Sequence, residues 1–171
     1  MQLIPRTVVR ALGATLLAAL GSAAPAQTTP AQTPLARQGE DDVIHSFTFH
    51  DRQVLRMGDR TLIHRELTGV STNAKGRGMF HNLGMRCLAT IEIEGGRAVS
   101  SGRCVDVDVD GDQIFHTFEN RGGTGAHVLI GGTGKYAGIS GRQEFTIPGP
   151  TKAPDGVSVL IVPARASWKL P

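Results

Sequence analysis

Four aspartates within the segment 106–112 are the first candidates for chemistry in this chain. They are Asp106, Asp108, Asp110 and Asp112. Their D-x-D-x-D-G spacing matches the first half of a calcium-binding EF-hand loop, but Thr117 stands where that loop requires a bidentate Glu. The alternation of Val and Asp instead favours a strand with one solvated face, followed by a type I′ turn at Asp110-Gly111. A solvated turn is the main interpretation, and a calcium site is the alternative.

The two cysteines are placed to form a disulfide. Gly95-Gly96 suits a two-residue hairpin turn, because glycine tolerates the positive φ that such turns need. Pairing Glu94 with Arg97 then sets Cys87 opposite Cys104 in a non-hydrogen-bonded pair, with a Cα separation of ~4.5 Å. An oxidising compartment allows this bond to form. The alternative is a pair of small buried thiols.

One feature of this hairpin conflicts with simple pairing. The apolar residues of the first strand share a face with Cys87, whereas the valines that follow Cys104 lie on the opposite face. A β-bulge at Gly102 would exchange the two faces, although it would also shift the pairing that aligns the cysteines.

The six histidines show neither H-x-H nor H-E-x-x-H spacing. The strand residues His45 and His64 could converge on a cavity with Glu66 or Asp51 and bind a metal or act in acid–base chemistry. We expect most histidines to lie at the surface or to be hydrogen-bonded in the core. No G-x-S-x-G nucleophile motif is present in the sequence.

The start of the chain has the features of an exported precursor. Arg6 and Arg10 precede a short apolar run, and the small-residue site Ala24-Pro25-Ala26 follows it. This order predicts a signal peptide over 1–26, cleaved after Ala26, and a periplasmic or secreted protein. The run is shorter than the ~20 residues that span a bilayer. Cleavage lowers the formal net charge from +3 to +1, and no Lys/Arg run remains, which disfavours nucleic acid as a partner.

Residues 27–42 are polar and contain prolines, so they predict a flexible linker before a single domain over 43–171. The 22 glycines and 9 prolines suit a turn-rich β protein. Eight apolar segments of strand length predict an all-β fold, an eight-stranded antiparallel β-barrel, since closure removes exposed edges. The segments are Val43–Phe49, Thr61–Val70, Cys87–Ile93, Ala98–Val109, Gln113–Phe118, Ala126–Ile130, Arg142–Ile147 and Val157–Ala166.

A glycine-rich motif occupies residues 131–141. It imitates a dinucleotide-binding fingerprint, but that fingerprint requires a helix, and the glycines and prolines that follow permit none. We interpret the motif as a tight link between strands, with Tyr136 and Trp168 closing a barrel end. Its structural members are Gly131, Gly132, Gly134, Tyr136, Gly138 and Gly141.

This motif resembles the Gly-Gly-Thr-Gly signature of the allene oxide cyclase and dirigent-protein barrels. The wider pattern over Cys87–Ile147 is similar to small exported bacterial proteins of this class whose function is unassigned. The resemblance implies an eight-stranded antiparallel barrel whose central cavity guides a reactive small molecule. It transfers no catalytic residues, because the glycine signature is structural in that class.

The main functional hypothesis is an exported, non-catalytic protein that binds a small hydrophobic molecule or acts as an accessory interaction protein, without a cofactor. The alternatives are a cofactor-free isomerase or cyclase working in the barrel cavity, and a calcium-stabilised module. A cavity lined with ionisable groups of shifted pKa would favour the enzyme. An interior filled by core side chains would favour a structural or interaction role.

Overall fold

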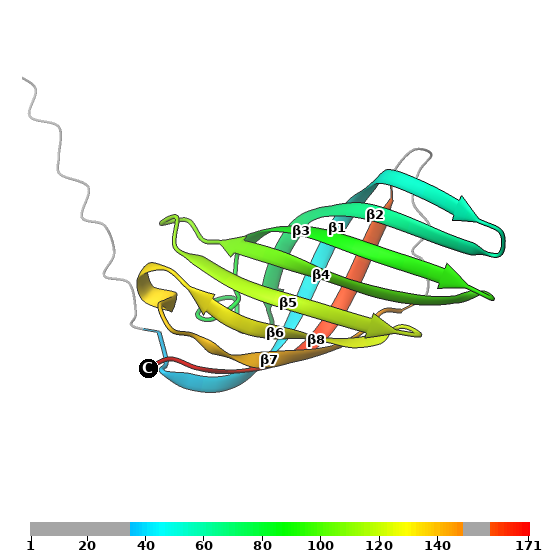
Figure 1. Ribbon diagram of the computed structural model, residues 1–171. Helices are drawn as coiled ribbons and strands as arrows, with labels where there is room; N and C mark the ends of the chain where they lie inside the picture. The colour runs from blue at the N-terminus through cyan, green and yellow to red at the C-terminus, as the bar shows by residue number, and fades with distance from the viewer. Residues whose placement is uncertain (1–34, 149–157) are drawn as a thin grey trace, which may run out of the picture. The chain divides into compact units, whose positions relative to one another are not determined.

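Eight antiparallel strands form a closed barrel in which each strand pairs with its neighbours in sequence and β8 pairs with β1 (Figure 1). The computed structural model describes residues 35–148 and 158–171. The strands are β1 (Gln38–Met57), β2 (Arg60–Asn73), β3 (Leu83–Glu94), β4 (Arg97–Val107), β5 (Gln113–Arg121), β6 (Thr124–Gly132), β7 (Ser140–Thr146) and β8 (Val159–Lys169). The expected barrel is confirmed. Within the described ranges, no helix is long and apolar enough to cross a membrane.

The first strand is longer than the sequence indicated, at both of its ends. Gln38 already pairs with Lys169 of β8, so residues 38–42 belong to the barrel rather than to a linker. The polar composition of residues 38–42 is typical of a linker, but the structure buries Asp41 and pairs it with Lys75 at 3.1 Å. The expected signal peptide, 1–26, and the linker residues up to 34 lie outside the described residues.

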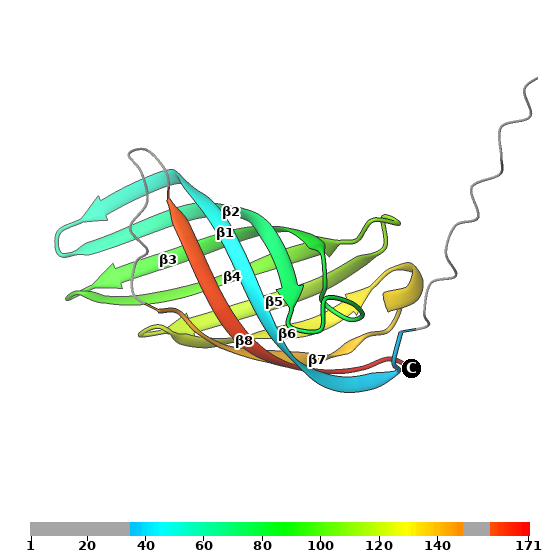
Figure 2. The same cartoon turned by 180° about the vertical axis from the view of Figure 1, so that it is seen from behind.

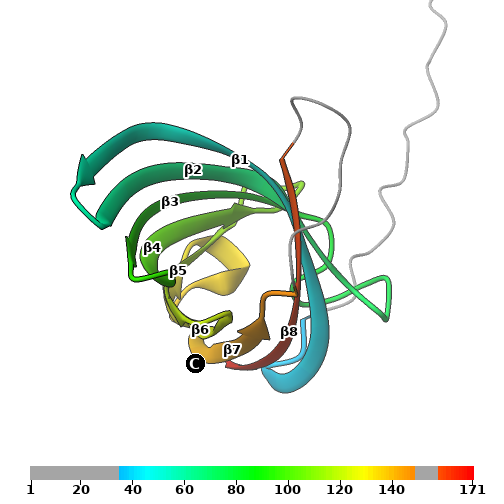
Figure 3. The same cartoon turned by 90° about the vertical axis from the view of Figure 1, so that its right-hand side faces the viewer.

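At its other end, β1 continues beyond its pairing with β8. Figure 2 shows the two strands side by side, and their described pairing ends at Thr48 and Val159. Beyond Thr48, β1 continues to Met57 with β2 as its described partner. The register between these two strands shifts at Arg52. The view in Figure 3 shows the strands curving around a common interior.

Two apolar clusters fill much of the barrel interior. The first contains Val43, Met79, Phe80, Leu83, Ile114, Leu129, Tyr136, Ile139, Ala166 and Trp168. The second contains Phe47, Leu67, Met85, Cys87, Ala89, Cys104, Phe145, Val162 and Ala164. The burial of Tyr136 and Trp168 agrees with their expected places, and the Trp168 ring meets the Phe80 ring edge-on at a centroid distance of 5.6 Å. The 3₁₀ turn η1 (Gly134–Tyr136) links β6 to β7 and carries Tyr136 into the first cluster.

The β3–β4 hairpin confirms the predicted disulfide. Gly95 and Gly96 both have positive φ, of 55° and 75°, as a type I′ turn requires. Cys87 pairs with Cys104 in the unshifted register, the two sulfurs are bonded, and the Cα atoms lie 4.1 Å apart. The register continues through Gly102, so the β-bulge that would have exchanged the two faces is absent from this hairpin.

The valines after Cys104 explain why no bulge is needed. Val105 is 37% exposed on the outside of the barrel, while Asp106, the next residue, points inward and is 1% exposed. The interior is therefore polar at this level. Gly102 serves a different purpose, because a Cβ there would collide with the ring of Phe118, which packs against it.

Candidate functional site

A layer of polar side chains lies inside the barrel between the two apolar clusters. Alternate residues of a strand face the same side. Along the inner face of β1, His45 therefore lies between Val43, which belongs to the first cluster, and Phe47, which belongs to the second. Five strands contribute one residue each to this layer, and all five are buried. The members are His45, Asp106, His116, His127 and Gln143.

Hydrogen bonds organise this layer into two groups. The Asp106 carboxylate accepts a hydrogen bond from Nε2 of His116 at 2.9 Å, and Nδ1 of His116 meets Nδ1 of His127 at 2.9 Å. In the second group, Nε2 of His45 lies 2.9 Å from Oε1 of Gln143. The rings of His45 and His127 stand at a centroid distance of 5.4 Å, which joins the groups.

Burial sets the protonation of two of these histidines. Desolvation lowers the pKa of His45 to about 4, although the charge of Asp106 opposes the shift. Desolvation also lowers the pKa of His127 well below its ordinary value, and His116 and His45 add to this effect. Both side chains are therefore neutral at neutral pH. Neutral, buried imidazoles can act as general bases only where a substrate comes within hydrogen-bond distance of them.

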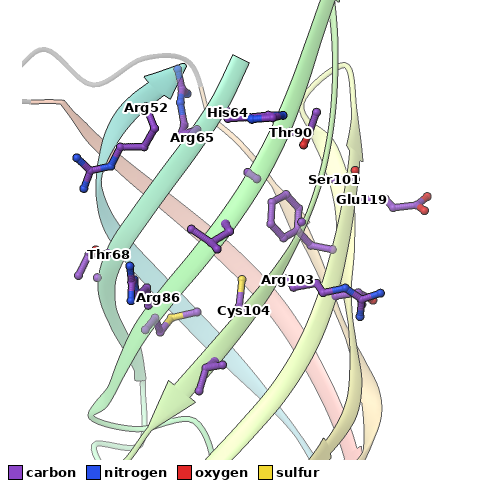
Figure 4. Close-up of a pocket in the computed structure, with 18 of the residues that line it drawn as sticks. Arg52, His64, Arg65, Thr68, Arg86, Thr90, Ser101, Arg103, Cys104 and Glu119 are labelled. Carbon is purple, nitrogen blue, oxygen red and sulfur yellow. The ribbon is translucent and has the colours of Figure 1, made fainter. Parts of the chain in front are cut away.

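The largest pocket among the described residues is lined mainly by exposed and half-buried residues of the barrel wall. It has a volume of about 1310 Å³ and is lined by residues of β2 to β5 together with Arg52 and Gln53 of β1. Figure 4 shows the arginines and polar side chains of this lining. Leu88 and Val105 line it and are 61% and 37% exposed. Three buried members of the second cluster, Met85, Ala89 and Cys104, also border it. We call this surface the outer concavity.

Arginines border the outer concavity. Glu66 accepts hydrogen bonds from Nε of Arg52 at 2.8 Å and from Nε of Arg86 at 2.7 Å. The hydrogen bonds from Arg52 and then Arg86 lower the pKa of Glu66. Arg103 and Glu119 line the same surface. The surface thus combines an apolar floor with hydrogen-bonded guanidinium groups.

The structure does not bring together the residues that the sequence placed in an acid–base group. His45 lies inside the barrel, while His64 is exposed and bonds to Gln53 at 3.0 Å. Glu66 contacts arginines on the outside, and Asp51 pairs with Arg65 at 2.6 Å. The reason is alternation along β2, because even-numbered residues there face away from the core. The hypothesis of a shared site for these residues is wrong.

The four aspartates of 106–112 also separate. Asp106 faces inward, whereas Nζ of Lys135 binds Asp108 and Asp110, each at 2.6 Å. Asp112 accepts a hydrogen bond from the backbone N–H of Lys135 at 3.1 Å. The glycine-rich motif therefore holds a lysine against the acidic turn. Although burial opposes it, hydrogen bonding to Asp108 and Asp110 raises the pKa of Lys135.

The turn itself differs from the expected type I′. The N–H of Gly111 bonds to the carbonyl of Asp108 at 3.1 Å, which makes Val109 and Asp110 the central residues. Gly111 has a φ of 87°, but among the described non-glycine residues only Phe80 and Asn82 have positive φ. The geometry is a type I turn followed by a left-handed glycine. The side chain of Asp108 stabilises it by accepting from the N–H groups of Asp110 and Asp112.

Two members of the interior layer follow from the disulfide and the strand pattern. Once Cys104 is placed inside by the disulfide, Asp106 must also point inward, because it lies two residues further along the same strand. His116 is the direct partner of Cys104 in β5 and shares its face. The remaining members depend on the register of β6 and β7, which no turn motif in the sequence defined.

Comparison with known proteins identifies no family for this chain. No protein-family model matches the chain, and no curated protein sequence matches it. Among solved structures, the chain is similar to a pterocarpan synthase dirigent protein, GePTS1. The two share 8% sequence identity with a TM-score of 0.47, over 86% of this chain and 100% of that chain. The barrel described above therefore rests on its own strand pairing.

Proposed function

We propose that this chain is an exported, non-catalytic binding or accessory protein, and that the outer concavity is its binding surface. The observation that carries the proposal is the division between inside and outside. The inward-facing clusters and the polar layer are buried, whereas most residues that line the largest pocket are exposed or half-buried ones of β2–β5, with Met85, Ala89 and Cys104 as its buried members. Ligand binding therefore needs no opening of the barrel.

The same division argues against the isomerase or cyclase alternative. A general acid or base must come within hydrogen-bond reach of its substrate. The two histidines with lowered pKa, His45 and His127, are 0% and 4% exposed. They are held by neighbouring polar groups and do not line the outer concavity.

The surface favours a molecule with an apolar body and an anionic group. Leu88 and Val105 supply apolar contact, and Arg103 supplies a guanidinium that can bind a carboxylate, sulfonate or phosphate. Anilinonaphthalene sulfonate is a suitable probe, since it has both parts. We expect its fluorescence to rise on binding to the wild-type protein.

Matched variants test the location of this site. Leu88→Glu places a negative charge in the outer concavity, and Ile161→Glu places the same charge on β8, where Ile161 is 42% exposed and outside the concavity. We expect the first variant to bind the probe at least ~10-fold more weakly, which corresponds to ~1.4 kcal/mol, and the second to bind like the wild type. Equal binding by both variants would rule out this surface.

Export is supported by the disulfide and by the pattern of residues 1–26, which lie outside the described residues. N-terminal sequencing of the protein recovered from the periplasm or medium should begin at Gln27. Recovery of folded, exported protein that retains Met1 would contradict cleavage after Ala26.

A further inference from the structure

Cys104, His116 and His127 form a compact group that neither the proposed binding surface nor the disulfide explains in full. One ligand atom from each side chain, a sulfur and two imidazole nitrogens, lies within 4.8 Å of the other two. All three residues are buried. Thiolate and imidazole are the preferred ligands of Zn²⁺ and of its spectroscopic substitute Co²⁺.

Asp106 orients this group in the manner of a metal site. Because a carboxylate only accepts hydrogen bonds, Nε2 of His116 is the protonated nitrogen in its 2.9 Å contact with Asp106. A neutral His116 then has its lone pair on Nδ1, which faces Nδ1 of His127 at 2.9 Å. Two nitrogen ligands of a tetrahedral zinc ion lie ~3.4 Å apart, so a small shift would admit the metal. Metal-binding histidines commonly donate their second N–H to such a carboxylate.

The disulfide prevents Cys104 from acting as a ligand, because metals bind the thiolate. We propose that reduction of the Cys87–Cys104 bond creates a zinc-type metal site formed by Cys104, His116 and His127. A dithiol supplies two electrons and two protons, which convert the disulfide into two thiols, while the dithiol itself becomes a disulfide. Metal binding then releases the Cys104 thiol proton to solvent. Oxidation and metal binding therefore compete for the same sulfur.

Two cysteine variants separate this site from the general effect of losing the disulfide. Cys87→Ser and Cys104→Ser both lack the bond, but only Cys87→Ser keeps the thiol beside the histidines. We expect Cys87→Ser to bind one equivalent of Co²⁺ with a thiolate-to-cobalt charge-transfer band, which Zn²⁺ then removes. Cys104→Ser should show no such band and bind at least ~10-fold more weakly. Identical spectra from the two folded variants would overturn the proposal.

A second measurement uses the natural sequence and does not depend on either variant folding. Wild-type protein is reduced with dithiothreitol, desalted, and exposed to air with or without Zn²⁺, and its free thiols are counted over time. We expect Zn²⁺ to slow the loss of thiols several-fold. His127→Gln, treated in the same way, should lose most of this protection. An unchanged oxidation rate in the wild-type protein contradicts a metal site at Cys104.

Discussion

One run of aspartates supplies Asp106 to the polar layer and Asp108, Asp110 and Asp112 to the acidic turn, yet the two regions lie in opposite environments. Asp106 is 1% exposed and meets His116, whereas Asp110 has a side chain that is 42% exposed and meets Lys135. The inner group must satisfy its hydrogen bonds without water, while the outer group is partly solvated. The difference shows that a run of alternating aspartates does not have one role, because strand geometry sends its members to different environments.

The comparison is tested most strongly by removing one carboxylate from each region. Asp106→Ala leaves the buried Nε2–H of His116 without an acceptor, so we expect a loss of about 1–3 kcal/mol in the free energy of unfolding. Asp110→Ala removes the partly exposed ion pair with Lys135 and should cost about 1 kcal/mol or less. Urea denaturation of both variants measures the difference. Similar losses would mean that burial does not separate the two regions.

Acid should lower the free energy of unfolding through the buried histidines of the polar layer. The unfolded chain binds protons at histidines below the ordinary pKa of 6.5, whereas His45 in the folded barrel resists protonation until about pH 4. The contribution of His45 to the free energy of unfolding is therefore fully present above pH 6.5. It declines by about 3 kcal/mol as the pH falls toward 4. His127 acts in the same direction.

Thermal unfolding across this pH range measures the effect. His45→Gln removes one titrating group, so its melting temperature should fall less steeply between pH 6.5 and 5 than that of the wild type. The exposed His64→Gln provides the control and should follow the wild-type profile. Parallel profiles for all three proteins would contradict a role for burial at His45.

The disulfide offers a third test, because Cys104 lies on the face that carries Asp106 and pairs with His116. Cys104→Ser should lower the free energy of unfolding by about 2 kcal/mol, less than the ~3 kcal/mol of chain entropy for a loop of this size, since the hairpin already holds the strands together. A reductant should lower the melting temperature of the wild type and leave the variant unchanged. Two reactive thiols in non-reduced, denatured wild-type protein would contradict the bond.

The sequence predicted the barrel, its eight strands and the disulfide because these depend on local rules. Turn residues mark the hairpins, and the Gly95-Gly96 turn fixes the β3–β4 register. The start of β1 was missed because Asp41 is polar although it is buried against Lys75. The polar layer was missed for a related reason. Its histidines come from β1, β5 and β6 and become neighbours only after the barrel closes, so their spacing along the chain carries no metal or catalytic signature.

Calcium should have the smallest effect on stability, although the acidic turn, Asp108–Asp112, carries part of the motif that suggested a calcium site. Asp106 is turned inward, and the ammonium group of Lys135 already binds Asp108 and Asp110. We therefore expect millimolar calcium to leave the wild-type melting temperature nearly unchanged. A ligand at 100 times its dissociation constant would instead add ~2.7 kcal/mol, or several degrees.

Lys135→Gln sharpens this test because it removes the cation and leaves the neighbouring carboxylates in place. Calcium should raise the melting temperature of this variant more than that of the wild type, since a divalent ion can then relieve repulsion among Asp108, Asp110 and Asp112. Glutamine keeps most of the length of the side chain, so the packing of the glycine-rich motif changes little. A calcium shift of several degrees in the wild-type protein would show that the turn binds the ion despite Lys135, and that its aspartates form a metal site after all.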